Sequence, residues 1–92
     1  MDGEVVGRVV ISKSGRDKGE YYVIVSVLDD KHAGIANGIS RTMDAPKKKN
    51  LRHLCITNSR VPEFASLIKA EKVSANLKLA SVLKREENGG RR

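Results

Sequence analysis

The chain has 92 residues, of which 39% are hydrophobic, so it can form one domain with a modest core and little room for a deep substrate cleft. Its 18 Lys and Arg residues against 11 Asp and Glu give a net charge of +7, which favours a polyanionic partner such as nucleic acid. A basic surface that only maintains solubility is the alternative. The single cysteine excludes an internal disulfide, and there is neither an apolar signal segment nor an apolar run of about 20 residues. We therefore expect a cytoplasmic protein without a membrane partner.

Short β-branched stretches in the first two-thirds of the chain, partly alternating with polar residues, predict strands. The predicted strands are residues 5–12, 21–28, 33–37, 39–42 and 51–57. Asn37-Gly38 is a strong signal for a tight hairpin between the third and fourth of them. In the last strand, Leu54 and Ile56 are expected to be buried.

The hydrophobic spacing changes to a helical period after Asn58. Residues 59–69 predict a short helical turn, and residues 75–87 predict a helix with Ser74 as its N-cap. The side chains expected to pack inward are Phe64, Leu67, Ile68, Leu79, Val82 and Leu83. The chain thus divides into a small mainly β barrel (1–58), a helical C-terminal extension packed on it (59–88) and a flexible basic tail (89–92).

The connection between the first two predicted strands, residues 13–20, is rich in charge and glycine. Its cations are Lys13, Arg16 and Lys18. Gly15 and Gly19 permit the positive φ angles of a sharp loop, and exposed N–H groups beside cations form a concavity suited to phosphate. Asp17 is expected to orient Arg16 or Lys18, or to cap the turn. A hairpin turn whose charges are merely solvated is the alternative.

A second basic connection, residues 43–50, contains three consecutive lysines and is followed by Arg52. Pro46 lacks an N–H donor, which argues against a central strand here, so the lysine run is expected to lie in a loop. Adjacent lysines repel one another unless a polyanion neutralises them. A solvated charge run explains the pattern equally well in isolation. If both connections lie at one end of a barrel, they form a single positive surface.

Aromatic residues are scarce, at 3% of the chain. Of the adjacent pair Tyr21 and Tyr22, the second is expected to point outward, while Phe64 belongs to the helical region. Proteins that bind single strands usually present aromatic side chains for stacking, so this composition favours folded or double-helical RNA. His53 and Cys55 are too few for a zinc site. We expect no metal, cofactor, small-molecule substrate or catalytic residue, and an enzyme is the least favoured class.

Residues 7–25, GRVVISKSGRDKGEYYVIV, resemble the KOW motif, which is a strand with a glycine, a Lys/Gly-rich loop and a hydrophobic strand. The matching positions are Gly7, Val9, Lys13, Gly15, Lys18, Gly19 and Val23. The stretch KKKNLRHL within residues 28–58 is similar to KOW proteins related to large-subunit ribosomal proteins of archaea and eukaryotes, a group with short stand-alone bacterial members. Beyond Asn58 only a generic helical pattern matches.

This resemblance implies an SH3-like five-stranded barrel with a C-terminal helix, and an RNA-binding role on the ribosome or in translation. The candidate RNA-binding residues are Lys13, Ser14, Gly15, Arg16, Lys18, Arg41, Lys47, Lys48, Lys49 and Arg52. A KOW barrel that instead contacts ribosomal protein or RNA polymerase is the alternative. Exposure of Tyr22, Ile24 and Phe64 would support that alternative.

Overall fold

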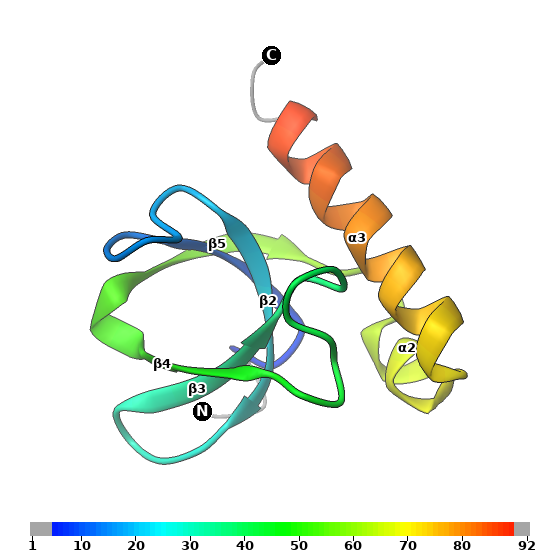
Figure 1. The fold of residues 1–92 in the computed structure, drawn as a ribbon, viewed down its shortest axis with the longest axis horizontal. Coiled ribbons are helices and arrows are strands. Elements are labelled where there is room, and N and C mark those ends of the chain that lie inside the picture. Colours follow the sequence, from blue (N-terminus) through cyan, green and yellow to red (C-terminus); the bar gives the residue numbers. More distant parts are fainter. Residues whose placement is uncertain (1–4, 90–92) are drawn as a thin grey trace.

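The computed structural model describes residues 5–89, and its elements follow one another as a strand-rich half and a helical half (Figure 1). In chain order they are β1 (Arg8–Ser12), β2 (Tyr21–Val27), β3 (His32–Ala36), β4 (Lys47–Asn50), the 3-10 turn η1 (Leu51–His53), β5 (Leu54–Arg60), α2 (Phe64–Lys69) and α3 (Lys72–Gly89). Of the predicted basic tail, Gly89 belongs to α3, and residues 90–92 lie outside the described residues.

The strands form one antiparallel sheet in the order β4-β3-β2-β1-β5. Its two edge strands are consecutive in the chain and are connected by η1, so the sheet curls around its own inner face (Figure 1). The prediction of five strands and a C-terminal helix is confirmed, although the helices α2 and α3 make the chain a mixed β and α structure. Within residues 5–89 no strand ladder joins β4 to β5, so the sheet is open between them.

The central strands β1 and β2 are buried on both faces of the sheet, which agrees with their nearly continuous apolar sequences. Val9 and Val10 are adjacent in β1 and fully buried on opposite faces. The inner face carries Val10, Tyr22, Ile24, Ala33, Ile35 and Leu54. The outer face packs against the helical half through Val9, Val23, Ala36, Val61, Leu67, Ala75, Leu79, Val82 and Leu83.

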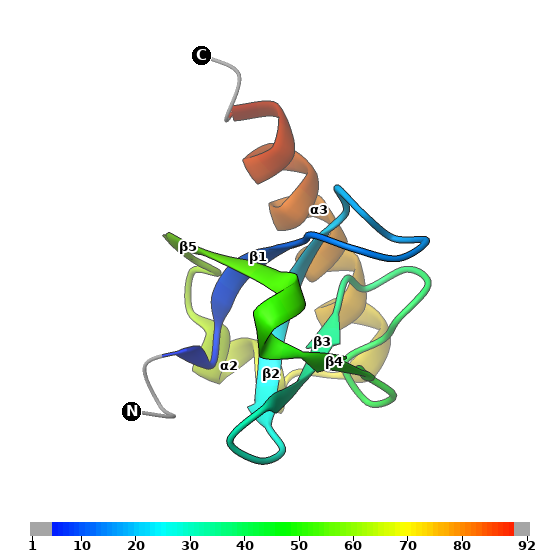
Figure 2. The same cartoon turned by 90° about the vertical axis from the view of Figure 1, so that its left-hand side faces the viewer.

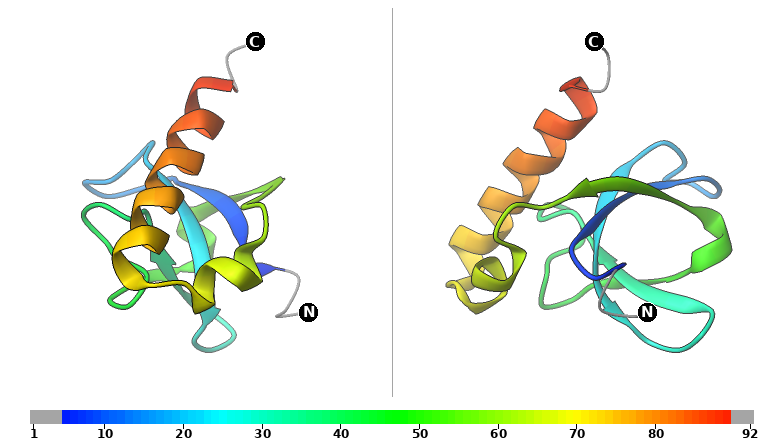
Figure 3. Two further views of the ribbon diagram at one scale, coloured as in Figure 1. Left: turned by 90° about the vertical axis from the view of Figure 1, so that its right-hand side faces the viewer. Right: turned by 180° about the vertical axis from the view of Figure 1, so that it is seen from behind.

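The helices lie together outside the curled sheet, beside β2, and leave the ends of the curl uncovered (Figures 1 and 3). The predicted inward face of the long helix is confirmed, since Leu79, Val82 and Leu83 are buried. The helix begins at Lys72 and not after Ser74, whose hydroxyl donates to Glu71 Oε1 (3.2 Å) and does not cap the helix.

Several expected boundaries and burials differ from the structure. Gly7 has φ +89°, which breaks the extended backbone, so β1 starts at Arg8 and not at residue 5. Ile56 is 39% exposed because β5 is an edge strand with a neighbour on one side only. Ile68 is 53% exposed, whereas Leu67 on the same short helix is buried and Phe64 is half-buried.

The predicted return strand at residues 39–42 is wrong. Asn37 and Gly38 do form a turn, but the Asn37 side chain accepts hydrogen bonds from the N–H groups of Ile39 and Arg41, which prolongs the irregular backbone. The resulting connection extends to residue 46 and packs on α3, where the N–H of Met43 donates to Asn76 Oδ1 (2.9 Å). The strand that pairs with β3 is the lysine run itself, β4.

Candidate functional site

The β1–β2 loop, residues 13–20, has a defined backbone held by its own hydrogen bonds. Gly15 and Gly19 adopt φ +88° and +90°, as their predicted role requires. The N–H of Gly19 donates to the Ser12 carbonyl (2.9 Å), and the N–H of Lys13 donates to the His53 carbonyl in η1 (2.8 Å). Within the described chain, the four consecutive N–H groups of residues 14–17 have no acceptor, and of these residues Gly15 and Arg16 are exposed at the loop tip.

A buried carboxylate fixes this loop to the sheet. We call Asp17 and the four side chains that contact it the Asp17 network; the other members are Ser12, Tyr22, Lys47 and Lys49. Asp17 is 7% exposed; its Oδ1 accepts from Ser12 Oγ (2.8 Å) and Lys49 Nζ (3.1 Å), and its Oδ2 accepts from Tyr22 OH (3.0 Å) and Lys47 Nζ (3.0 Å). The expectation that Asp17 orients Arg16 or Lys18 is therefore wrong.

The network determines the ionisation of its members. Burial disfavours the Asp17 carboxylate, but the hydrogen bonds from Ser12, Lys47, Lys49 and Tyr22 outweigh it and hold the pKa of that carboxyl well below its usual range. Burial, the hydrogen bond to Asp17 and the nearby carboxylate charges raise the pKa of the Tyr22 hydroxyl far above its ordinary value. At neutral pH the loop is thus held by a carboxylate, two lysines and a neutral phenol.

The lysine run is divided between two faces because it lies in a strand and not in the expected loop. Lys47 and Lys49 point to the inner side and pair with Asp17, and Lys49 Nζ also donates to the Ser14 carbonyl (3.0 Å). Lys48, opposite Gly34 in the ladder, is exposed on the other side. The two basic segments do come together, but two of the three lysines are paired with a carboxylate and Lys49 is buried.

The β1–β2 loop and η1 still present cations to a ligand, although Lys48 and the helix residues Lys69, Lys78 and Arg85 are exposed as well. Lys13, Arg16, Lys18 and Arg52 are exposed, and within residues 5–89 none of them forms an ion pair. The Lys47 side chain is 31% exposed beside them. Arg41 is also exposed, on the connection between β3 and β4, which projects from the same side of the molecule as the β1–β2 loop (Figure 2).

The aromatic side chains are not available for stacking as expected. Tyr22 is 2% exposed on the inner face, so the prediction that it points outward is wrong. Its neighbour Tyr21 and Phe64 are half-buried against the outer core. Ile24 is also fully buried, which removes two of the three residues whose exposure would have supported a protein-interaction surface.

Sequence reasoning missed Ser12 and Tyr22 as members of the site. Ser12 occupies the last position of β1 and is 2% exposed, and a polar residue at an inward strand position needs a buried partner. Tyr22 sits next to Tyr21 in a strand, so one of the two had to face the interior. The alternation of side chains along the strands thus indicated that Ser12 and one of the two tyrosines face the interior. Their partner Asp17 is identified only from the position of the β1–β2 loop in the structure.

The Asp17 network makes the stability of the folded protein depend on pH in the acidic range. A carboxyl whose pKa is lower in the folded state contributes stability above its unfolded pKa, near 4, and loses it as the pH falls through the folded pKa. We expect the free energy of unfolding of the protein to fall by about 2 kcal/mol more between pH 5 and pH 2 than that of an Asp17→Asn variant. Urea unfolding at each pH, followed by circular dichroism, measures this difference. Equal pH dependence in both proteins would contradict the assigned ion pairs.

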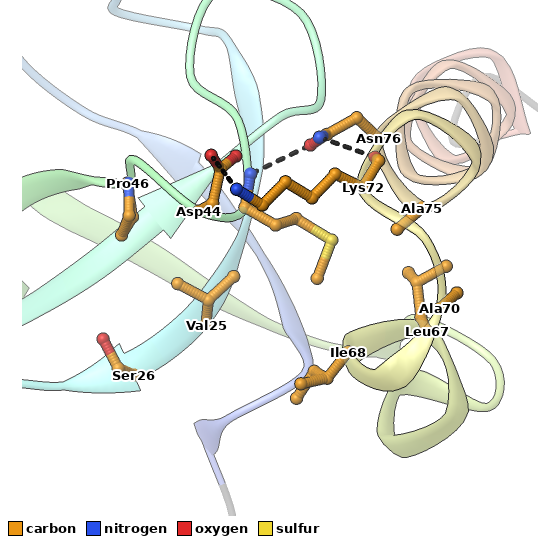
Figure 4. Close-up of a pocket in the computed structure, with 11 residues that line it drawn as sticks. Val25, Ser26, Asp44, Pro46, Leu67, Ile68, Ala70, Lys72, Ala75 and Asn76 are labelled. Carbon is orange, nitrogen blue, oxygen red and sulfur yellow. Dashed lines mark hydrogen bonds and ion pairs between the residues drawn. The ribbon is translucent and has the colours of Figure 1, made fainter.

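A separate cleft of about 330 Å³ lies between β2, the 43–46 segment and the helices (Figure 4). Val25, Met43 and Leu67 are among its apolar lining residues. Among the described residues that line it, the only charged ones are Asp44 and Lys72, which pair with each other at 3.4 Å. The cleft therefore adds no net charge to the positive surface.

No known protein-family model matches this chain. Within residues 5–89 there is no group of three or more His, Cys, Asp or Glu side chains that could hold a metal ion. The same part of the chain contains no helix with the length and apolar character needed to cross a membrane.

Proposed function

We propose that this chain is an RNA-binding protein that docks on structured RNA through phosphate contacts and without chemistry. The observation that carries the proposal is the set of exposed cations without ion pairs, Lys13, Arg16, Lys18 and Arg52, around a loop tip with free N–H donors within residues 5–89. Cations beside oriented N–H groups are the features that bind phosphate oxygens. Lys47, which contacts Asp17 of the loop, extends this surface toward β4, and Arg41 adds an exposed cation on the β3–β4 connection.

The type of RNA follows from the rigidity of the surface and its lack of stacking groups. Single-strand binders combine a basic groove with exposed aromatic rings, whereas double-helical RNA is bound through its shape, phosphates and 2′-hydroxyls. Here Tyr22 is buried, and Tyr21 and Phe64 are half-buried. The proposed ligand is therefore folded or double-helical RNA with phosphates at fixed spacing.

The fold supports a more specific proposal as well. A curled five-stranded antiparallel sheet, in the order β4-β3-β2-β1-β5 with a short 3-10 turn before the last strand, is consistent with an SH3-like barrel. Together with the resemblance of residues 7–25 and of the KKKNLRHL stretch to KOW proteins, this leads us to propose a role on the ribosome or in translation. Ribosomal RNA is then the first ligand to test.

Binding of a fluorescein-labelled RNA hairpin, measured by anisotropy across a salt series, tests the proposed function. We expect the logarithm of the affinity to fall linearly with the logarithm of salt concentration, with a slope of about 0.7–0.9 per phosphate contact. A single-stranded RNA of equal length should bind more weakly at every salt concentration. Absence of binding at low salt, or an affinity independent of salt, would refute the proposal.

A further inference from the structure

The Asp17 network places an anionic side chain at the centre of a surface that we propose binds an anion, and this requires an explanation. A carboxylate there lowers the local positive potential and so opposes binding of phosphate. Its charge, however, is directed inward, because both oxygens are occupied by Ser12, Tyr22 and the two lysines. The Asp17 carboxylate therefore holds the loop in place and does not face a ligand that it could repel.

The loop depends on this residue for its position. Asp17 lies within the loop and is bonded to β4, 30 and 32 residues further along the chain. Lys49 Nζ bridges Asp17 and the Ser14 carbonyl, so one buried ammonium group fixes two points of the loop. Between these two points lie Gly15 and Arg16, the tip with free N–H groups.

From these contacts we infer that Asp17 is a positioning residue that makes the site selective for double-helical over single-stranded RNA. The inference rests on the proposed function. Holding the loop before binding avoids the conformational entropy of ordering it in the complex. A fixed loop matches the regular phosphate spacing of a duplex, whereas a flexible single strand can adapt to a mobile loop as well as to a fixed one. Loss of the Asp17 carboxylate should thus lower the affinity for duplex RNA and change the affinity for single-stranded RNA much less.

The test compares Asp17→Asn with Glu20→Gln as its matched control. Both changes remove one negative charge from the same loop, but Glu20 is exposed and the hydrogen bond that its carboxylate makes to the network is the one from the Tyr22 hydroxyl (3.1 Å). Its backbone bonds to Ser12 and Asp17 are unaffected by the substitution. We expect Asp17→Asn to weaken hairpin RNA binding by about fivefold, to change binding of a single-stranded oligouridine by less than about twofold, and to speed amide hydrogen exchange in residues 13–19. Glu20→Gln should bind the hairpin as tightly as the unchanged protein or more tightly.

Simple electrostatics makes the opposite prediction, since removing an anionic group should strengthen RNA binding. The inference is overturned if the Asp17→Asn variant folds and binds the hairpin as tightly as the unchanged protein, or more tightly. It is also overturned if the variant loses the same affinity for the hairpin as for the single strand. If Asp17→Asn does not fold, Ser12→Ala and Tyr22→Phe each remove one hydrogen bond to Asp17 without changing the charge. Each is then expected to weaken hairpin binding more than single-strand binding, and equal effects on both RNAs overturn the inference.

The unchanged protein separates this result from failure of the proposed function. If it does not bind the hairpin at low salt, the RNA-binding proposal fails, and the selectivity assigned to Asp17 fails with it. If it binds, but the Asp17→Asn and Glu20→Gln variants behave alike, only the positioning role fails. Amide exchange in residues 13–19 shows in either case whether Asp17 orders the loop.

Discussion

Replacing Lys13, Arg16 and Lys18 with glutamine is expected to weaken binding of the RNA hairpin by roughly 10- to 100-fold at moderate salt. These side chains are exposed and, within residues 5–89, free of ion pairs, so each can neutralise a phosphate and release a counterion. The salt dependence should become shallower by about 0.7–0.9 for each phosphate that the variant no longer neutralises. Anisotropy titrations over a salt series measure both quantities. The fold should be unaffected, because none of the three side chains belongs to the core.

The control for this variant replaces Lys69, Lys78 and Arg85 with glutamine. It removes two lysines and one arginine, as the loop variant does, from exposed positions on α2 and α3. Lys78 and Arg85 lie on the side of α3 that faces Pro62 and Glu63, whereas other residues of α3 face Glu20 of the β1–β2 loop. The net charge of the two variants is identical, so a general attraction between a basic protein and RNA would weaken both equally. We expect the helix variant to retain most of the affinity and the original salt slope. Equal losses would mean that the loop is not the binding surface.

Replacing Gly38 with alanine is expected to destabilise the protein by roughly 2–5 kcal/mol. Gly38 has φ +83°, and a Cβ built there would overlap the Asn76 carbonyl oxygen and approach the N–H of Ala80 at 3.0 Å. These neighbours are helix backbone, so relief requires α3 or the β3–β4 connection to move. Urea unfolding, followed by the helical signal in circular dichroism, measures the loss.

The control for Gly38→Ala is Gly19→Ala, which has the strain of a positive φ angle without the overlap between a Cβ atom and the backbone of α3. Gly19 has a similar angle, φ +90°, but a Cβ there would meet nothing within 4 Å. We expect this control to cost only about 1–2 kcal/mol, the strain of a left-handed backbone. If both variants lost the same amount, the close packing of the β3–β4 connection on α3 would be refuted.

Some features of the fold follow from short-range patterns in the chain. The first three strands, the inward face of the long helix and the positive φ angles of Gly15 and Gly19 depend on neighbouring residues or on the helical period. The same holds for the two clusters of cations, Lys13 to Lys18 and Lys47 to Arg52, which are visible as charge in the sequence. These features could be predicted because their causes lie within one element or one turn.

The lysine run shows why the rest of the site could not be predicted. A strand of Lys47, Lys48 and Lys49 has low intrinsic preference for β structure, and it forms because β3 provides a ladder and Asp17 provides a buried partner. Both partners are distant in the chain. Composition determined that the protein is basic, and the hydrophobic spacing indicated a strand-rich first part followed by a helix. Tertiary structure alone decided which cations face solvent. Lys49 is buried beside the Asp17 carboxylate, and Lys47 forms an ion pair with the same group. Because side chains alternate along β4, Lys48 lies on the opposite face of the sheet and is exposed.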